Sequence, residues 1–344
     1  MIGVYEVTPD LKTKLTDYKI VFDGHYTQPT IEGPKFYKRN GYYYIMAPAG
    51  SVKTGWQVCL RSKNIYGPYE EKIVMMQGAS KINGPHQGAL VELEDGRWIF
   101  LHFQDMKAYG RVVHLQPVEW IDDWPVCGKI GDKLLPGIPY EVCDYIIEKN
   151  SDYFIPVSDD FQGKELSLIW QTPANKTGHW YDVDNGLTLY CSYFDKEAYD
   201  ALNLTPNAFL TKIALYSFKV TTKLKLSLIH DGDEVGLCYM GSAYAYVCIK
   251  RKDNQNYVQL RQGKFKQSED VLLDEVAYDQ DSIELTLEYI GPDQYRLGYN
   301  DKVFETWFTA LPGRWIGGKY GIYAKGLKSG GKAIFEYFRV KKEE

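Results

Sequence analysis

Two Asx-Gly dipeptides, Asn40-Gly41 and Asp95-Gly96, each stand directly before a short aromatic run. The runs occupy residues 42–46 and 97–101 and are rich in Tyr, Trp, Ile and Phe, which favour strands. An Asx-Gly pair beside an apolar run is the strongest local signal for a β-hairpin. A glycine-rich loop, a turn, an aromatic strand and a partner strand therefore occur twice. A repeat of roughly 40 to 50 residues is typical of a propeller blade.

The second half of the chain also consists of short apolar runs separated by turn dipeptides such as Asp231-Gly232 and Gly291-Pro292. Many short strands at this spacing favour a β-sandwich. A short helix is expected over 195–202. The expected strands cover 187–190, 214–220, 244–251, 257–261, 283–289, 295–299, 302–307 and 333–340.

A stretch without sustained periodicity separates the two halves and contains Gly131, Pro136, Gly137 and Pro139. Gly and Pro interrupt regular structure, so this stretch is interpreted as a link between domains. We therefore predict an all-β chain. Residues 1–135 form a portion of a propeller, 136–157 a linker, and 158–344 a β-sandwich.

Composition excludes several classes of function. The net charge of −5 argues against a nucleic-acid partner, because phosphate binding needs a basic surface. No apolar run approaches the roughly 20 residues that a membrane span requires, so no membrane partner is expected. The six cysteines show no zinc-site spacing, and buried free thiols are the favoured interpretation. Aromatic residues make up 15% of the chain, which suits either strands or stacking on sugar rings.

Glu32 stands between Ile31 and the pair Gly33-Pro34, just before an expected strand. Gly and Pro restrict the loop backbone, so the carboxyl has little freedom. In an aromatic-lined pocket, desolvation would raise the pKa of this carboxyl, and a protonated carboxyl can donate a proton to a leaving oxygen. Taken by itself, a Glu in a loop is more often a solvated surface residue.

The segment IEGPKFYKRNGYYYI, residues 31–45, closely resembles the general-acid segment of glycoside hydrolase family 43. More narrowly, it resembles the β-xylosidases and α-L-arabinofuranosidases that carry a concanavalin-like C-terminal domain. Further stretches match that family in order and spacing over nearly the whole chain. They are residues 53–63 with 67–70, residues 83–88, residues 108–120, and residues 159–161 with 168–171.

The resemblance implies roles for five residues. Glu32 corresponds to the general acid, and His86 to the central histidine that holds a calcium ion or a water in such enzymes. A buried histidine without metal is the alternative, since calcium prefers six to eight oxygens. Arg111 corresponds to a substrate-contacting arginine, with a structural salt bridge as the alternative. Trp56 is a candidate sugar platform or a blade-packing residue, and Gln87 is a weaker candidate for substrate binding.

Two carboxylates that the resemblance implies have no counterpart in the sequence. Family members are five-bladed inverting enzymes that use an aspartate base and a second aspartate besides the acid. Asp10, Asp17 and Asp23 precede Glu32, but their setting is that of a surface loop. The chain is therefore interpreted as truncated, with Met1 an internal methionine. Half a propeller has open sheet edges, so we expect it to need a homo-oligomeric or other partner chain that closes the ring.

The expected function is inverting hydrolysis of O-glycosyl bonds in xylo-oligosaccharides or in the arabinose side chains of xylan. No cofactor is required for this chemistry, although calcium at His86 is considered. The alternative is an inert fragment that acts at most as a carbohydrate-binding module, because both aspartates are missing. A cytoplasmic location is expected, and a secreted or periplasmic one stays open.

Overall fold

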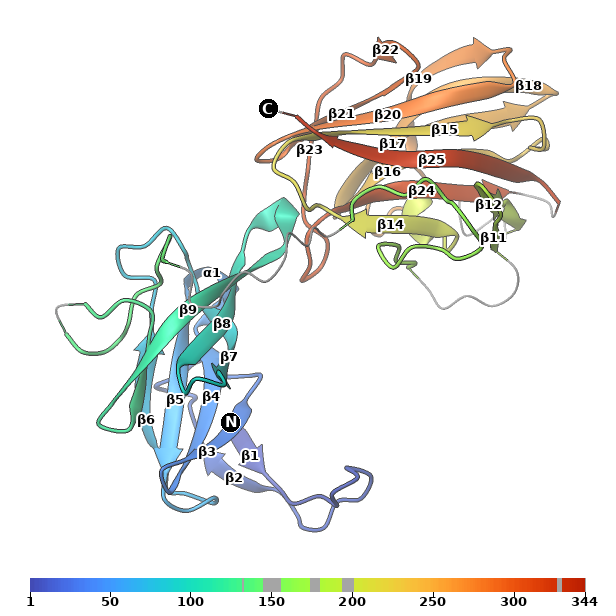
Figure 1. Cartoon of the computed structure of the whole chain (residues 1–344). Coiled ribbons are helices and arrows are strands. Elements are labelled where there is room, and N and C mark those ends of the chain that lie inside the picture. The colour runs from blue at the N-terminus through green and yellow to red at the C-terminus, as the bar shows by residue number, and fades with distance from the viewer. Residues whose placement is uncertain (132, 145–155, 174–179, 194–200, 327–329, 344) are drawn as a thin grey trace. The chain divides into compact units, whose positions relative to one another are not determined.

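The computed structural model describes residues 1–131, 133–144, 156–173, 180–193, 201–326 and 330–343. The chain divides into two compact units (Figure 1). The first comprises Met1–Met106 and Arg111–Asp152, and the second comprises Lys107–Gly110 and Tyr153–Glu344. Strands dominate both units, so the predicted all-β class is confirmed. Among the described residues, no helix is long and apolar enough to cross a membrane.

Two four-stranded antiparallel sheets form most of the first unit, each with its strands in chain order, as in a propeller blade. A two-stranded sheet and a one-turn helix α1 (Ser51–Thr54) accompany them, while the 3₁₀ turn η1 (Lys107–Tyr109) belongs to the second unit. The blades are β3 (Lys35–Arg39), β4 (Tyr42–Ala49), β5 (Trp56–Ser62) and β6 (Glu70–Met75), then β7 (His86–Glu92), β8 (Trp98–Asp105), β9 (Arg111–Ile121) and β10 (Trp124–Cys127); the small sheet is β1 (Ile2–Val4) with β2 (Lys19–Phe22).

The predicted hairpin turns join the first two strands of each blade. Asn40 and Gly41 both have positive φ, 47° and 76°, which a type I′ turn requires. Gly96 also has a positive φ of 81° and lies between β7 and β8. These turns fix which aromatic strands pair within each blade, because a short connection leaves little choice of register.

Strand β4 contributes to two different hydrophobic clusters. Tyr44 and Met46 pack with Phe100 and Val118 of the other blade, whereas Ile45 and Ala47 pack in a cluster that includes Ile2. Successive strand residues point to opposite faces of a sheet, so alternate β4 side chains serve the two clusters. The blade is therefore covered on both faces, and its strand positions are fixed where the candidate site lies.

The described part of the expected linker is attached to the first unit. Gly137 forms a bridge with Met75, Ile138 pairs with Lys129, and the Tyr140 N–H donates to Gln116 Oε1 at 2.8 Å. Residues 145–155 lie outside the described part. Conversely, Lys107–Gly110 were predicted in the first domain, but they group with the second unit. There the Ala108 carbonyl accepts a hydrogen bond from the Gly318 N–H at 2.7 Å.

Two large, mainly antiparallel sheets make up the second unit, which confirms the predicted sandwich. The expected helix over 195–202 falls mainly on residues outside the described part, and a 3₁₀ turn η2 covers Leu202–Leu204. One sheet contains β11 (Tyr181–Val183), β12 (Leu187–Tyr190), β25 (Lys332–Lys342), β15 (Phe218–Lys225), β20 (Ser282–Ile290), β21 (Gln294–Tyr299), β22 (Lys302–Val303) and β23 (Phe308–Thr309). The other contains β13 (Ser192–Tyr193), β24 (Lys319–Gly326), β16 (Glu234–Met240), β17 (Ala243–Lys252), β18 (Gln255–Lys264), β19 (Val271–Tyr278) and β14 (Ala208–Lys212).

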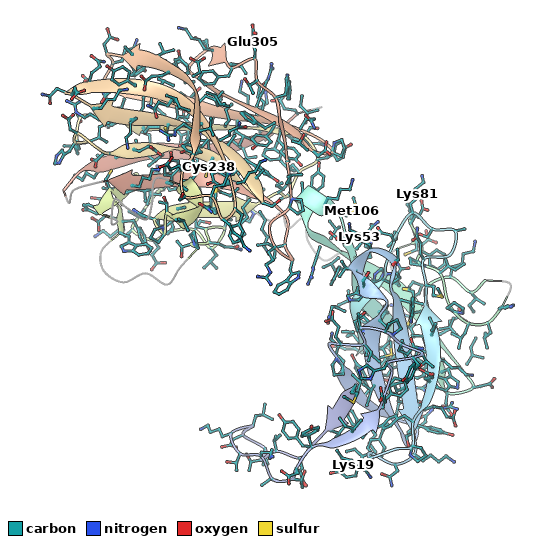
Figure 2. All side chains as sticks on the ribbon, turned by 180° about the vertical axis from the view of Figure 1, so that it is seen from behind. Lys19, Lys53, Lys81, Met106, Cys238 and Glu305 are labelled. Atoms are coloured by element: carbon teal, nitrogen blue, oxygen red, sulfur yellow. The ribbon has the colours of Figure 1, made fainter. Side chains whose placement is uncertain are left out.

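The sandwich core contains side chains from both sheets, such as Leu237 of β16 and Leu285 of β20. A second cluster lies on the other face of β16 and contains Cys238, which Figure 2 labels. All six cysteines are free, and five of them are buried, as expected. Cys143 is exposed and differs from that expectation.

Candidate active site

Glu32 lies in the loop between β2 and β3, and the backbone on both sides of it is held. Ile31 is buried in the cluster beside β4, and the Glu32 N–H donates to the Pro48 carbonyl at 3.2 Å. Gly33 has a φ of 52°, a conformation that glycine adopts without steric cost. The loop therefore presents the carboxyl in a defined direction, as the Gly-Pro pair predicted.

The surroundings of the Glu32 carboxyl differ from the prediction of a closed aromatic pocket. Its side chain is 57% exposed. The described residues that contact its carboxyl are polar, namely an imidazole and a carboxamide. The carboxyl is exposed because it projects from the loop toward the start of β7 instead of packing beneath β4.

Two side chains at the start of β7 hold one oxygen of this carboxyl. Nε2 of His86 lies 3.2 Å from Glu32 Oε1, and Nε2 of Gln87 donates to the same oxygen at 3.1 Å. Gln87 has a φ of 53° within a β-bulge between His86 and Ala89, and the bulge turns both side chains toward Glu32. Neither contact uses Oε2.

Lys35 completes the cluster and was missed by the sequence analysis. Its Nζ donates to Gln87 Oε1 at 3.1 Å and to the Gly33 carbonyl at 3.0 Å. Burial lowers the pKa of Lys35, while the nearby Glu32 raises it. A cation on Oε1 of the Gln87 carboxamide fixes the orientation of that amide, so the NH₂ group must face Glu32. In the sequence, only the position of Lys35, three residues after Glu32 and on the strand that follows, could have indicated this lysine.

His86 is 1% exposed, and burial lowers its pKa, with a further lowering by Arg111 that opposes the raising effect of Glu32. The ring is therefore neutral at pH 7. A neutral ring that donates from Nε2 to Glu32 has an unprotonated Nδ1. This Nδ1 is buried and has no hydrogen-bond partner in the described structure. The ring packs edge-on against Phe103, with 5.7 Å between centroids.

Calcium at His86 does not fit the residues in the described part of the chain. Those residues contain no group of three or more His, Cys, Asp or Glu side chains placed to hold a metal ion. His86 supplies one nitrogen and Glu32 one oxygen, whereas calcium takes six to eight oxygen ligands. The available Nδ1 suits a single water molecule better than a calcium ion.

Arg111 and Trp56, the other predicted site residues, lie in different settings. The Arg111 guanidinium lies 4.6 Å from the Phe103 ring centroid and close enough to His86 to lower its pKa. Trp56 Nε1 donates to Gln28 Oε1 at 2.6 Å. A Cβ on Gly50 would approach the indole to 2.6 Å, so the ring covers Gly50 closely. Arg111 therefore lies near the Glu32 cluster, and Trp56 is anchored within its blade.

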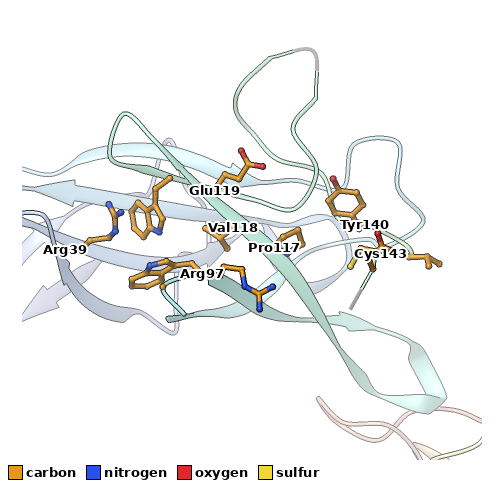
Figure 3. Close-up of a pocket in the computed structure, with 12 residues that line it drawn as sticks. Arg39, Arg97, Pro117, Val118, Glu119, Tyr140 and Cys143 are labelled. Atoms are coloured by element: carbon orange, nitrogen blue, oxygen red, sulfur yellow. The ribbon is translucent and has the colours of Figure 1, made fainter. Parts of the chain in front are cut away.

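A separate cavity of about 850 Å³ lies elsewhere on the first unit (Figure 3). Its walls include Arg39, Arg97, Pro117, Glu119 and Tyr140, and none of these residues contacts Glu32. Glu32 is not among the residues that line this cavity, so the cavity and the Glu32 cluster are separate features.

Two family models match the chain. Residues 158–341 match the domain described as "Beta xylosidase C-terminal Concanavalin A-like domain". Residues 2–125 match "Glycosyl hydrolases family 43". The chain belongs to glycoside hydrolase family 43. Membership of the family and the concanavalin-like domain, both expected from the sequence, are thus confirmed.

Two curated relatives align over about two thirds of the chain. A putative beta-xylosidase of Xylanibacter ruminicola is 42% identical over 226 residues, which cover 65% of this chain and 42% of the relative. The non-reducing end alpha-L-arabinofuranosidase BoGH43B of Bacteroides ovatus is 30% identical over 257 residues, which cover 67% of this chain and 43% of the relative. The alignments span less than half the length of these family 43 relatives.

Solved family 43 structures share the fold of this chain. A bifunctional GH43-CE protein of Bacteroides eggerthii has a TM-score of 0.80 at 23% identity, covering 99% of this chain and 45% of that protein. A xylan beta-1,4-xylosidase of Bacillus halodurans has a TM-score of 0.75 at 20% identity, covering 98% and 70%. At these identities the likeness concerns the fold. It supports propeller blades followed by a concanavalin-like sandwich.

Proposed function

We propose that Glu32 is the general acid of a family 43 glycosidase that hydrolyses O-glycosyl bonds of xylo-oligosaccharides or of arabinose-substituted xylan. The sugar backbone is suggested by the relatives, whose names include both a beta-xylosidase and an alpha-L-arabinofuranosidase. Arg111 contacts the substrate near the acid, and the Trp56 ring is a candidate platform for a sugar. Gln87 orients the acid, a role that replaces the substrate contact first expected for it.

One observation carries this proposal: Glu32 Oε1 accepts two contacts while Oε2 accepts none from His86 or Gln87. A general acid must keep one oxygen protonated and aimed at the leaving group. Two hydrogen-bond donors on Oε1 bias the proton to Oε2, which faces away from them. The exposed carboxyl also leaves room for a leaving sugar, which binds from the solvent side.

Inversion is the proposed stereochemical course, and it requires a base roughly 6.5 to 9.5 Å from the acid, with room for a water. The aspartates that precede Glu32 in the chain, Asp10, Asp17 and Asp23, are hydrogen-bonded to neighbours in their own loops, namely Thr8, Lys14 and His25. Their engagement there favours a second candidate function, in which the chain by itself is inert and acts as a carbohydrate-binding module.

Hydrolysis of two substrates tests the role of Glu32. Aryl β-xyloside has a leaving group that needs little protonation, whereas xylobiose has a sugar leaving group that needs a full proton. We expect Glu32→Gln to reduce xylobiose cleavage by about 10² to 10⁴-fold and aryl xyloside cleavage much less. The exposed Glu92→Gln on β7 is the matched control. Equal losses on both substrates would argue against a general acid.

The same experiment separates the two candidate functions. Proton NMR of fresh product gives the anomer, and α-xylose from a β-xyloside would establish inversion. If the unmodified chain cleaves neither xylosides nor arabinofuranosides but binds xylo-oligosaccharides in calorimetry, the binding-module function is correct for the chain by itself. If it does neither, both candidate functions fail.

A further inference from the structure

A cavity of about 690 Å³ lies within the sandwich unit, away from Glu32. Its walls come from η2, from the turn between β16 and β17, from the loop after β18 and from the loop before β24. We propose that this cavity binds an acidic oligosaccharide, a xylan-type chain that carries a uronic-acid side group. The choice of a xylan backbone rests on the proposed function, but the binding itself does not depend on hydrolysis.

The charge of the cavity wall favours an anionic ligand. Lys266, Arg314 and Lys319 line the cavity, and no Asp or Glu is among its lining residues in the described structure. Burial lowers the pKa of Lys319, and the neighbouring Lys212 lowers it further. Three cations and no acidic residue in one described cavity wall contrast with the net charge of −5 of the whole chain. A carboxylate bound there would offset the repulsion between Lys319 and Lys212, and arginine can hold it with two parallel hydrogen bonds.

The apolar part of the wall suits the flat face of a sugar ring. Phe265 is 57% exposed and Ile316 is 50% exposed, although both are large hydrophobic residues. Leu210 and Met240 also line the cavity. An aromatic ring has few rotatable bonds, so it loses little conformational entropy when a sugar stacks on it. The stacked sugar then covers the whole exposed face of the ring. A free inorganic anion would use the cations and leave these apolar side chains uncovered, which favours a sugar acid.

Two polar side chains in the cavity wall have atoms without a protein partner. Thr205 is 2% exposed, and its Oγ1 has no hydrogen-bond partner in the described structure. Nδ2 of Asn203 is also buried and has no hydrogen-bond partner there. Asn203 Oδ1 accepts a hydrogen bond from the Tyr244 hydroxyl at 3.2 Å, so the amide is oriented and Nδ2 is left over. A buried polar atom without a partner is costly, and sugar hydroxyls can both donate and accept hydrogen bonds.

Backbone strain at the rim supports a binding role. Lys266 has a φ of 75° and Trp315 has a φ of 61°, a region that long side chains seldom adopt. Such residues gather at ligand-binding sites, because binding benefits from a fixed loop geometry. The Arg314 guanidinium lies 4.4 Å from the Trp315 ring centroid, which steadies a cation at the rim.

Calorimetry of the full chain with two oligosaccharides tests the proposal. The ligands are neutral xylotetraose and a xylotriose that carries one glucuronic acid group. We expect the acidic ligand to bind about tenfold more tightly at about 0.05 M salt, with most of that advantage lost at about 0.5 M. Arg314→Gln should remove the preference for the acidic ligand, whereas Lys302→Gln, on the other sheet, should leave it unchanged. Equal affinities for both ligands would overturn the proposal.

Methyl NMR locates the bound ligand independently of any activity. The Met240 and Ile316 methyl resonances should shift with the acidic ligand, and Thr205→Val, which keeps the shape but removes the hydroxyl, should weaken binding by about tenfold. Glu32→Gln should leave these shifts intact, which separates this site from the proposed active site. Shifts confined to residues near Glu32, or no binding at all, would show that the sandwich cavity is not a ligand site.

Discussion

Lys35 connects the backbone of the Glu32 loop to the side-chain amide of Gln87, which faces Glu32. Its Nζ contacts the Gly33 carbonyl and Gln87 Oε1, so a single cation bridges the loop and β7. Local sequence indicated Glu32 and His86 through motifs. Lys35 carried no such signal, because a lysine on an exposed hairpin strand is ordinary. Its importance follows from Gln87, a residue 52 positions away in the chain.

Replacing Lys35 with Met should free the Gln87 amide to rotate and present its oxygen to Glu32, which would repel the carboxylate. We expect the Gln87 side-chain amide resonances to shift and broaden in proton–nitrogen NMR spectra. Where hydrolysis is measurable, kcat should fall about tenfold with little change in KM, because the loss of one charged hydrogen bond affects orientation and not sugar binding.

Lys38→Met is the matched control for this prediction, because Lys38 lies on the same strand with an exposed side chain and no contact with Gln87. It should leave the Gln87 resonances and kcat unchanged. Identical spectra for the Lys35 variant and the unmodified protein would show that the amide is held by other contacts.

At the scale of elements, the bulge at the start of β7 needs a glycine. A Cβ on Gly88 would come within 1.8 Å of the Phe100 ring, which is fully buried between the blades. The Gly88 N–H also donates to Gln57 Oε1 at 3.3 Å. The bulge that turns His86 and Gln87 toward Glu32 therefore depends on close approach of this backbone to the core.

Gly88→Ala should destabilise the first unit by about 1 to 3 kcal/mol, because the added methyl forces Phe100 from its place. Denaturant unfolding followed by tryptophan fluorescence measures this. Gly131→Ala serves as the control, since its nearest contact would be an ordinary 3.6 Å. A Gly88→Ala protein as stable as the control would mean that Phe100 adjusts freely.

Some strands of the sandwich were expected from the sequence and others were missed. The expected strands over 244–251 and 283–289 correspond to β17 and β20. Strands β16 and β24 were not expected. In β16, Leu237 faces the sandwich core and Cys238 faces the second cluster, so the sequence lacks alternation. A continuous apolar run does not by itself distinguish a buried strand from other buried segments.

On the scale of the whole molecule, each unit contains a buried group that responds to acid. In the first unit, burial lowers the pKa of His102 to about 4. In the second, Glu234 is fully buried; burial alone would raise its pKa, but Lys325 at 3.2 Å and Lys250 at 3.6 Å lower it to about 2. Both groups have a lower pKa in the folded protein than in the unfolded chain, so the free energy of unfolding decreases as the pH falls.

We expect the two units to lose stability in different pH ranges. Protonation of His102 costs the folded state nothing above pH 6.5, and the cost grows as the pH falls toward 4. The difference between the unfolded and the folded pKa of His102 corresponds to roughly 3 kcal/mol of unfolding free energy. The Glu234 contribution is complete above about pH 4.5 and is lost toward pH 2. In calorimetric scans at pH 7, about 5 and about 3.5, the falling pH should lower the melting temperature of the first unit before that of the second.

His102→Gln should weaken this response in the first unit, because an uncharged amide has no proton to gain, while His86 and His114, whose pKa values are also lowered by burial, keep the rest of it. Glu234→Gln should destabilise the second unit at pH 7 by several kcal/mol, since it leaves buried lysines without a counter-charge. A single transition that shifts uniformly with pH in the parent protein would contradict the separate responses.

The sequence by itself determined the hairpins and the all-β class, and it indicated the family 43 motif around Glu32, because turn chemistry and short motifs depend on neighbouring residues. Only the tertiary structure decided that Glu32 meets His86 and Gln87, which lie 54 and 55 residues further along the chain, and that Lys35 orients this contact. It also decided that Glu234 lies buried between two lysines from other strands. Such contacts depend on how sheets pack and on a one-residue bulge in β7, neither of which a local pattern of residues specifies.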